Sequence, residues 1–296
     1  MTVTTTLNHQ AGKRRNWAQY VFLAPTAIVL TLVVAAPLLY SVYLSFQTYI
    51  ITYGMGDFAG FGNYQSVLAD DFGSVSWVTL KLTFLCVTIE FFVAFGLALL
   101  LNQPHLPGRQ FYLIILLTPI LMTPVAIALM FRLMFNPSLG IVNWLIGGLG
   151  IPPQGWFGDP HLALGTVVFV DVWTETSMML LMLYAGLKSM PMEPVEAARI
   201  DGANRFHILR YVVWPLMRPV IMVTLLIRMI AALKSYDLIY MLTQGGPGKE
   251  TETISFYAYR LGFRFLDIGQ AAAVSFILLI VVIALTLFLL RVMREN

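Results

Sequence analysis

Charged side chains lie inside long apolar stretches of this sequence, where each charge is costly to place. They are Glu90, Arg132, Asp171, Glu175, Arg228 and Lys234, with Lys81 near the end of one of these stretches. Ionisable residues in such settings usually face the interior of a helix bundle or a water-filled cavity. Two kinds of chemistry follow. The charges can pair and hold a bundle together, or they can line a polar path and bond to a solute.

Asp171 and Arg228 are the clearest candidates for a buried pair. With a helix rise of about 1.5 Å per residue, they lie about 13 Å and about 12 Å from the same side of the bilayer. We therefore favour a structural role for Arg228. Arg132 and Lys234 fall within about one turn of the ends of their stretches, from which long side chains can reach the interface.

Asp171 and Glu175 are four residues apart, so they share one helical face with Met178 and Met182. Two carboxylates at this spacing ionise together only where a cation or water is near. A polar cavity would supply both, and Trp173 would add a stacking surface. The candidates for lining a solute path are therefore Glu90, Asp171, Trp173, Glu175, Arg228, Tyr236 and Asp237.

Membrane-spanning helices are the elements that would position these side chains. Hydrophobic residues make up 58% and charged residues 11% of the 296 residues, whereas a soluble domain usually carries about 25% charged residues. Six stretches reach the length of about 20 apolar residues that a crossing helix needs: 20–46, 79–102, 111–135, 162–187, 212–236 and 269–291. The alternation typical of barrel strands is missing from the sequence. We predict an all-α membrane protein with a tail at 1–19 and one transmembrane domain over 20–296.

The positions of lysine and arginine predict the orientation of these helices. Lys13, Arg14 and Arg15 precede the first stretch, and more basic residues follow the fourth and the sixth, whereas 47–78 and 136–161 contain none. Because cytoplasmic segments carry the excess of positive charge, both termini are predicted to be cytoplasmic. The first stretch is too long for the apolar core of a cleaved signal peptide, so we expect it to be retained.

The segment 188–211, between the fourth and fifth stretches, carries the most specific pattern. Pro194 suits the first turn of a helix, Gly202 is a natural stop, and Asn204 can cap a second helix. Two short helices with a bend at Gly202 are predicted. The polar residues Glu196, Arg199 and Asp201 surround the small pair Ala197 and Ala198. This pattern suits a knob that enters a cytoplasmic partner, and it equally suits a helix lying on the headgroups.

The same segment resembles the EAA loop of bacterial ABC importer permeases. Glu196-Ala197-Ala198, then Gly202 and Pro215, follow that motif in order, although Val212-Val213-Trp214 replaces its usual Ile-x-Leu. Other segments resemble the carbohydrate-type branch of this family, which includes maltose and glycerol-phosphate permeases. They lie at 62–64, 173–187, 236–240, 242–253 and 269–273, so the resemblance covers nearly the whole chain.

The resemblance implies a permease subunit in the inner membrane of a bacterial cell. It would form half of a translocation pore with a second, different permease and receive solute from an extracytoplasmic binding protein. Two ATPase subunits would bind the EAA loops. ATPase coupling would fall to Glu196, Ala197, Ala198, Arg199, Asp201, Gly202 and Pro215. The sequence has no G-x-x-x-x-G-K-[ST] phosphate loop. We therefore expect ATP and magnesium on the partner ATPase, no cofactor or metal on this chain, and no nucleic-acid partner.

Three other functions compete with this one. A secondary transporter driven by an ion gradient could relay protons through Glu90, Asp171 and Glu175, but it often shows matching repeats with interrupted helices. A membrane enzyme would need a nucleophile, a metal cluster or a cofactor motif, and the only cysteine is Cys86. A receptor or scaffold would not need charges along its spans.

Overall fold

The computed structural model describes residues 17–103 and 105–294. The chain divides into two units, Met1–Tyr43 and Leu44–Asn296. In the first unit, α1 (Trp17–Leu30) continues through a π-helical turn at Thr31–Ala35 into α2 (Ala36–Ser45), which ends in the second unit. Residues Tyr20–Ser45 are long and apolar enough to cross a membrane. Lys13, Arg14 and Arg15, on which the predicted orientation partly rests, lie outside the described residues.

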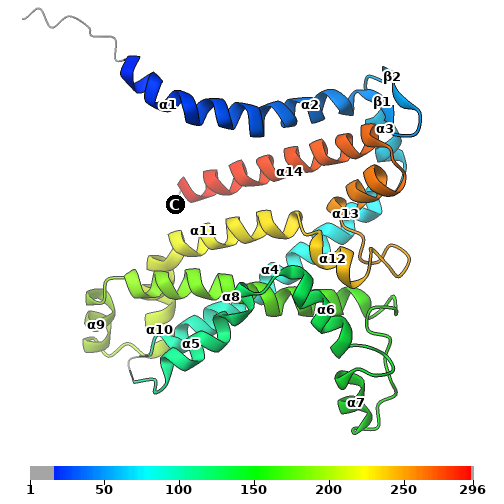
Figure 1. Ribbon diagram of the computed structural model, residues 1–296. Helices are drawn as coiled ribbons and strands as arrows, with labels where there is room; N and C mark the ends of the chain where they lie inside the picture. The colour runs from blue at the N-terminus through cyan, green and yellow to red at the C-terminus, as the bar shows by residue number, and fades with distance from the viewer. Residues whose placement is uncertain (1–16, 104, 295–296) are drawn as a thin grey trace, which may run out of the picture. The chain divides into compact units, whose positions relative to one another are not determined.

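The second unit is built around four long helices (Figure 1). These are α4 (Phe72–Leu101), α8 (Ala163–Ser189), α11 (Trp214–Leu233) and α14 (Ile268–Arg294). Each belongs to a segment long and apolar enough to span a membrane, which confirms the predicted helices at these places. α4 starts seven residues before the predicted stretch at 79, because helical structure continues past the apolar residues.

The predicted span at 111–135 is not one straight helix. It consists of α5 (Arg109–Leu117), a 3-10 turn at Thr118–Leu121 and α6 (Pro124–Met134), and the two parts are bent by 102°. Proline lacks the N–H that a continuing helix needs, so Pro119 and Pro124 favour this break. The Thr123 hydroxyl accepts a hydrogen bond from the backbone N–H of Ala126 and caps α6.

A small hairpin departs from the predicted all-α fold. β1 (Gln47–Ile50) pairs antiparallel with β2 (Gly54–Phe58), with Gln47 opposite Phe58 and Ile50 opposite Gly54. The hairpin is held from outside: the Asn63 side-chain amide donates to the carbonyls of Ser45 and Gln47, and the backbone N–H of Ile51 donates to Leu266. These long-range bonds explain why the local sequence did not predict it.

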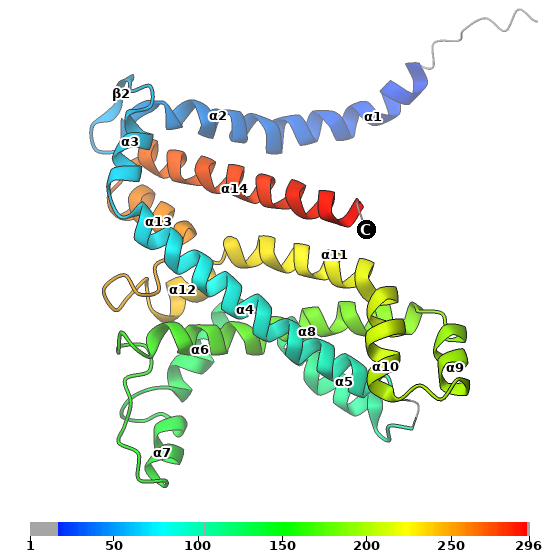
Figure 2. The same ribbon diagram turned by 180° about the vertical axis from the view of Figure 1, so that it is seen from behind.

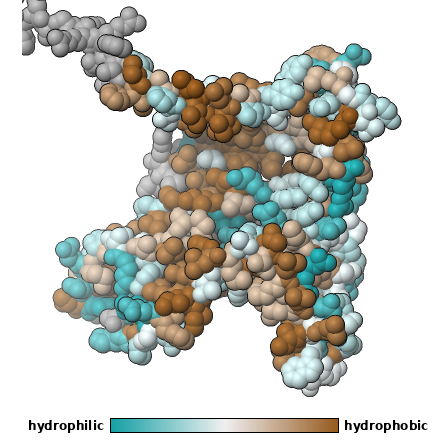
Figure 3. All heavy atoms as spheres, in the orientation of Figure 1, coloured by the Kyte–Doolittle hydropathy of each residue, from teal (hydrophilic) through white to brown (hydrophobic). Residues whose placement is uncertain are grey.

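The two ends of the second unit differ (Figures 1 and 2). One end carries α9 (Glu193–Ile200) and α10 (Arg205–Ile208). The other end carries the hairpin and short helices: α3 (Gly62–Ala69), α7 (Ile141–Gly147), α12 (Asp237–Leu242) and α13 (Ile254–Tyr259), with π-helical Arg260–Arg264. In Figure 3, hydrophilic side chains gather over α9 and α10.

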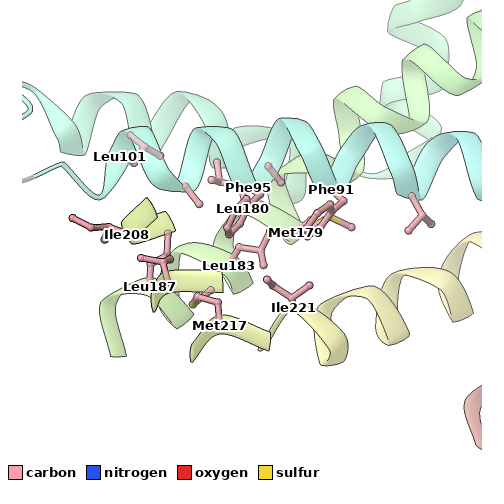
Figure 4. Close-up of a cluster of buried hydrophobic side chains, with 14 of the residues drawn as sticks. Phe91, Phe95, Leu101, Met179, Leu180, Leu183, Leu187, Ile208, Met217 and Ile221 are labelled. Atoms are coloured by element: carbon pink, nitrogen blue, oxygen red, sulfur yellow. The ribbon is translucent and has the colours of Figure 1, made fainter. Parts of the chain in front are cut away.

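The main core lies between α4, α8 and α11 (Figure 4). Phe91 and Phe95 of α4 meet Leu183 of α8 and Ile221 of α11 there. The helices approach closely at Gly186, where an added Cβ would lie 2.6 Å from a methyl carbon of Val220. Only glycine allows this approach without displacing α11.

Candidate functional site

Three charged side chains from three helices form one buried cluster. The Nε of Arg228 on α11 lies 2.6 Å from Oε2 of Glu90 on α4, and its Nη2 lies 2.8 Å from Oε1 of the same carboxylate. The same Nη2 also donates to Oδ2 of Asp171 on α8. Glu90, Asp171 and Arg228 are 0%, 4% and 6% exposed. This cluster, called the ion triad below, confirms the predicted Asp171–Arg228 pair.

Glu90 was predicted only as a path residue, and the structure places it as the second partner of Arg228. A bidentate arginine–carboxylate bond is strong and directional. Burying any one of these charges alone would cost free energy, because it would lose its hydration. In the triad, the bonds between opposite charges offset that cost. The triad therefore ties α4, α8 and α11 at one level of the bundle.

The triad also bears on metal binding. Ligand atoms of Cys86, Glu90 and Asp171 all lie within 4.8 Å of one another. Both carboxylates already bond to the guanidinium of Arg228. The arrangement therefore suits an ion pair better than a cation site, because a metal would have to displace an arginine that is always charged.

The other path candidates of α8 separate onto different faces. Glu175 is half-buried, one turn from Asp171. Trp173 points elsewhere and packs edge-on against Phe131 of α6, with ring centroids 5.2 Å apart. The Ser177 hydroxyl, two residues beyond Glu175, donates to the backbone carbonyl of Leu116.

Tyr236 and Asp237 lie at the far end of α11 from α9. Tyr236 lies inside an aromatic cluster. Its ring stacks on that of Tyr240, with centroids 5.5 Å apart, and its centroid lies 5.2 Å from that of Tyr259. Asp237 is exposed at the start of α12. Neither residue contacts the triad in the bonds described, so the structure does not join all seven candidates into one site.

An open apolar groove lies between α8 and α11. It is lined by Met182 of α8 and by Pro219, Val220 and Val223 of α11, and its volume is about 360 Å³. Met182 shares a helical face with Glu175. The residues that line the groove include none of the seven path candidates.

The segment after α8 has the predicted form. α9 ends before Gly202, whose φ of +81° is the left-handed geometry of a helix stop. Asn204 caps the next helix by accepting a hydrogen bond from the backbone N–H of His207. Glu196, Ala197, Arg199 and Asp201 are exposed, Ala198 is half-buried, and Ile200 is 86% exposed.

α9 packs on the bundle through Val195 and Ala198, and the chain continues from it into α11. Val195 is buried in the main core with Ile208. Helical structure runs without a break from Arg205 to Leu233 through a π-helical turn at Leu209–Val213. Pro215 follows this π-helical turn directly, and a proline within a continuous helix, which lacks an N–H, favours such an irregular turn. A short turn at 201–204 therefore connects α9 to the continuous helix that carries Arg228.

An ion-pair network at the opposite end was not predicted from the sequence. Arg260 lies 2.8 Å from Glu252 and 3.5 Å from Asp71, and Lys249 also bonds to Asp71. The bond from Lys249 lowers the pKa of Asp71, while burial raises the pKa of Glu252. The network ties the glycine-rich loop after α12 to the start of α4.

Comparisons with known proteins agree with this architecture. Residues 70–294 match the family model described as "Binding-protein-dependent transport system inner membrane component". The chain is 34% identical to the trehalose/maltose transport system permease protein MalF of Thermococcus litoralis over 276 residues, 93% of each chain. It is also 34% identical to the sulfoquinovosyl glycerol transport system permease protein SmoG of Agrobacterium fabrum, over 93% of this chain and 89% of the relative.

A solved structure has the same fold. It is a chain of a bacterial alginate ABC transporter, crystallised with a periplasmic protein bound to an alginate pentasaccharide. The TM-score is 0.81 at 25% identity, and the match covers 93% of each chain. The family match over most of the sequence, with relatives at this identity, shows that the chain belongs to the binding-protein-dependent transport system inner membrane components.

Proposed function

We propose that the chain is the permease subunit of an ATP-driven importer for a carbohydrate or a sugar derivative, and that it supplies half of the translocation pore. The observation that carries this proposal is the family match combined with sugar permeases among the relatives. Relatives named for neutral and for anionic solutes are equally similar, at 34% identity each. The names therefore leave the charge of the solute open.

The proposed orientation places both termini and α9 in the cytoplasm, following the excess of basic residues there. The hairpin, α7 and the loop after α12 then face the binding protein. A crystallised relative in complex with its periplasmic protein supports this assignment of partners. A second permease completes the pore, and two ATPase subunits bind the cytoplasmic side. ATP and magnesium belong to those ATPases, so this chain is a non-catalytic subunit.

The proposed mechanism couples the ATPase to the bundle through α9. ATP binding draws the two ATPase subunits together, and the exposed side of α9 moves with one of them. Val195 transmits this displacement to the main core, and the continuous helix from Arg205 to Leu233 carries it past Arg228. The ion triad keeps α4, α8 and α11 moving as one body, so the pore switches between two discrete states.

Variants of α9 test this coupling. Ala198→Trp adds bulk at a half-buried residue that packs against the main core and would displace α9, and Gly202→Pro is incompatible with a φ of +81°. Both should insert into the membrane normally, lose the ATPase on co-purification and abolish uptake. Ile280→Trp is the control, since Ile280 is exposed in the middle of α14, away from both proposed partner surfaces. Normal ATPase binding and uptake by both α9 variants would overturn the proposal.

A further inference from the structure

Glu175 differs from the other charged residues in the middle of the spans. Within residues 17–103 and 105–294, its carboxylate makes no hydrogen bond and no ion pair, and the side chain is half-buried. An unpaired carboxylate in a membrane helix is stable only where water or a polar solute reaches it. Glu175 therefore faces a space that a solute can enter.

The positive charge nearest to this space is already neutralised. Arg228 bonds to both Glu90 and Asp171 and is almost fully buried. With Glu175 included, three carboxyl groups surround one guanidinium. The electrostatic field at this level of the bundle therefore opposes an anion and offers hydrogen-bond acceptors.

Lys81 is exposed in the first half of α4, whereas two other basic residues of the spans lie near the ends of their helices. Arg132 is in the last turn of α6 and donates to the carbonyl of Met241. Lys234 is the C-terminal capping residue of α11. Neither reaches the level of Glu175, which is more than two turns inside α8 from either end.

The face of α8 that carries Glu175 continues into the apolar groove, which suits the apolar face of a sugar ring. Met178 and Met182 follow Glu175 on the same face of α8, and Pro219, Val220 and Val223 lie across the groove. An apolar wall with one well-placed polar group is typical of small-molecule sites. C–H groups of a pyranose can contact the wall while a hydroxyl donates to the carboxylate.

We propose that Glu175 selects for uncharged, hydroxyl-rich solutes on this path: its carboxylate accepts hydrogen bonds from solute hydroxyls and repels anionic sugar derivatives. This inference rests on the proposed function and sharpens it. The solute is then a neutral sugar or polyol, and uronic, sulfonated and phosphorylated sugars are excluded. Glu175 is a specificity-determining residue, whereas the ion triad is structural.

Uptake by the complete transporter in proteoliposomes, with its binding protein, is the first test. The neutral probes are maltose, trehalose and an arabinotriose, and the anionic probes are glycerol 3-phosphate, sulfoquinovosyl glycerol and an alginate trisaccharide. We expect ATP-driven uptake of a neutral probe and of no anionic probe. Glu175→Gln should lower kcat/KM for that probe about tenfold, because a charge-assisted hydrogen bond is lost. Ser275→Ala, which removes an exposed hydroxyl of α14 that bonds only to its own helix, is the control and should leave kcat/KM unchanged.

A second measurement bypasses selection by the binding protein. Dicyclohexylcarbodiimide couples to carboxyl groups in apolar surroundings, and peptide mass spectrometry can follow its reaction at Glu175 in the nanodisc-embedded complex. The transported neutral sugar should slow this reaction. Its anionic analogue, in which a primary hydroxyl is oxidised to a carboxylate, should require about a tenfold higher concentration for the same protection. Labelling of Glu90 should be unaffected, since the ion triad is closed to solute.

The outcomes separate this inference from the proposed function. ATP-driven uptake of an anionic probe at a rate equal to the neutral ones would overturn the role of Glu175 and leave the importer assignment standing. Equal protection by both forms of the sugar, or none by either, would also overturn it. If no probe of either class is transported, the carbohydrate assignment fails and the inference fails with it.

Discussion

Removing only the guanidinium of the ion triad should lower the free energy of unfolding far more than neutralising all three of its residues. In Arg228→Met, two carboxylates that are 0% and 4% exposed lose their shared partner, and the bidentate bond to Glu90 is broken. Deleting one partner of a buried ion pair costs about 3–5 kcal/mol. Because Arg228 bonds to two carboxylates, we expect the loss of stability to fall in the upper part of that range.

The neutral triple variant provides the contrast. In Arg228→Met combined with Glu90→Gln and Asp171→Asn, no buried charge is left without a partner. Replacing a buried ion pair by uncharged groups of similar size is often close to neutral, so about half or more of the lost stability should return. Arg132→Met, at the exposed end of α6, serves as the matched control and should change stability by less than about 1 kcal/mol.

The assay is the free energy of unfolding in mixed micelles, followed by circular dichroism during titration with a denaturing detergent. The expected order of stability is wild type, then the triple variant, then Arg228→Met. If Arg228→Met were within about 1 kcal/mol of the wild type, the triad would not bind the three helices together. A triple variant no more stable than Arg228→Met would show that lost packing, rather than stranded charge, causes the effect.

Three further predictions concern other parts of the molecule. Gly186→Val should lower the free energy of unfolding by at least about 1–3 kcal/mol through overpacking against α11, measured by the same titration; an unchanged value would contradict the close approach. Gly202→Ala should lower the free energy of unfolding by about 1 kcal/mol, because residue 202 has a left-handed backbone that alanine adopts at a cost. The variant should keep part of its uptake. Uptake as low as that of Gly202→Pro would contradict this explanation. The folded-state pKa of Asp71 is lowered, so its bond to Lys249 stabilises the fold above an unfolded pKa of about 4 and loses that effect as the pH falls through the folded value. Lys249→Met should therefore flatten the acid-induced loss of thermal stability, and an identical acid profile would show that this bond contributes nothing.

The parts of the fold that were predicted from the sequence depend on local signals. Long apolar stretches predict helices because lipid leaves the backbone no other partner. The stop at Gly202 and the cap at Asn204 are properties of single residues, and both are confirmed. The break within 111–135 also has local signals in Pro119 and Pro124. The apolar residues continue across both prolines, however, and this continuity predicted a single helix.

The missed parts depend on contacts between distant segments. Asp171 and Arg228 were predicted to pair because they lie at similar depths below the same side of the bilayer. The rotation of α4 that turns Glu90 toward them depends on how the helices pack. The hairpin depends on Asn63 and on the backbone of Leu266, far away in the sequence. The network of Asp71 and Arg260 joins residues that only the folded chain brings together.

Solute-stimulated ATP hydrolysis is the most direct test of the importer assignment. The complex would be purified through this chain, embedded in lipid nanodiscs and assayed with each sugar and the binding protein, singly and together. The account predicts that an ATPase co-purifies and that hydrolysis rises only when one sugar and its binding protein are both present. Failure of any ATPase to co-purify, together with uptake that follows a proton gradient in vesicles, would contradict it and identify a secondary transporter.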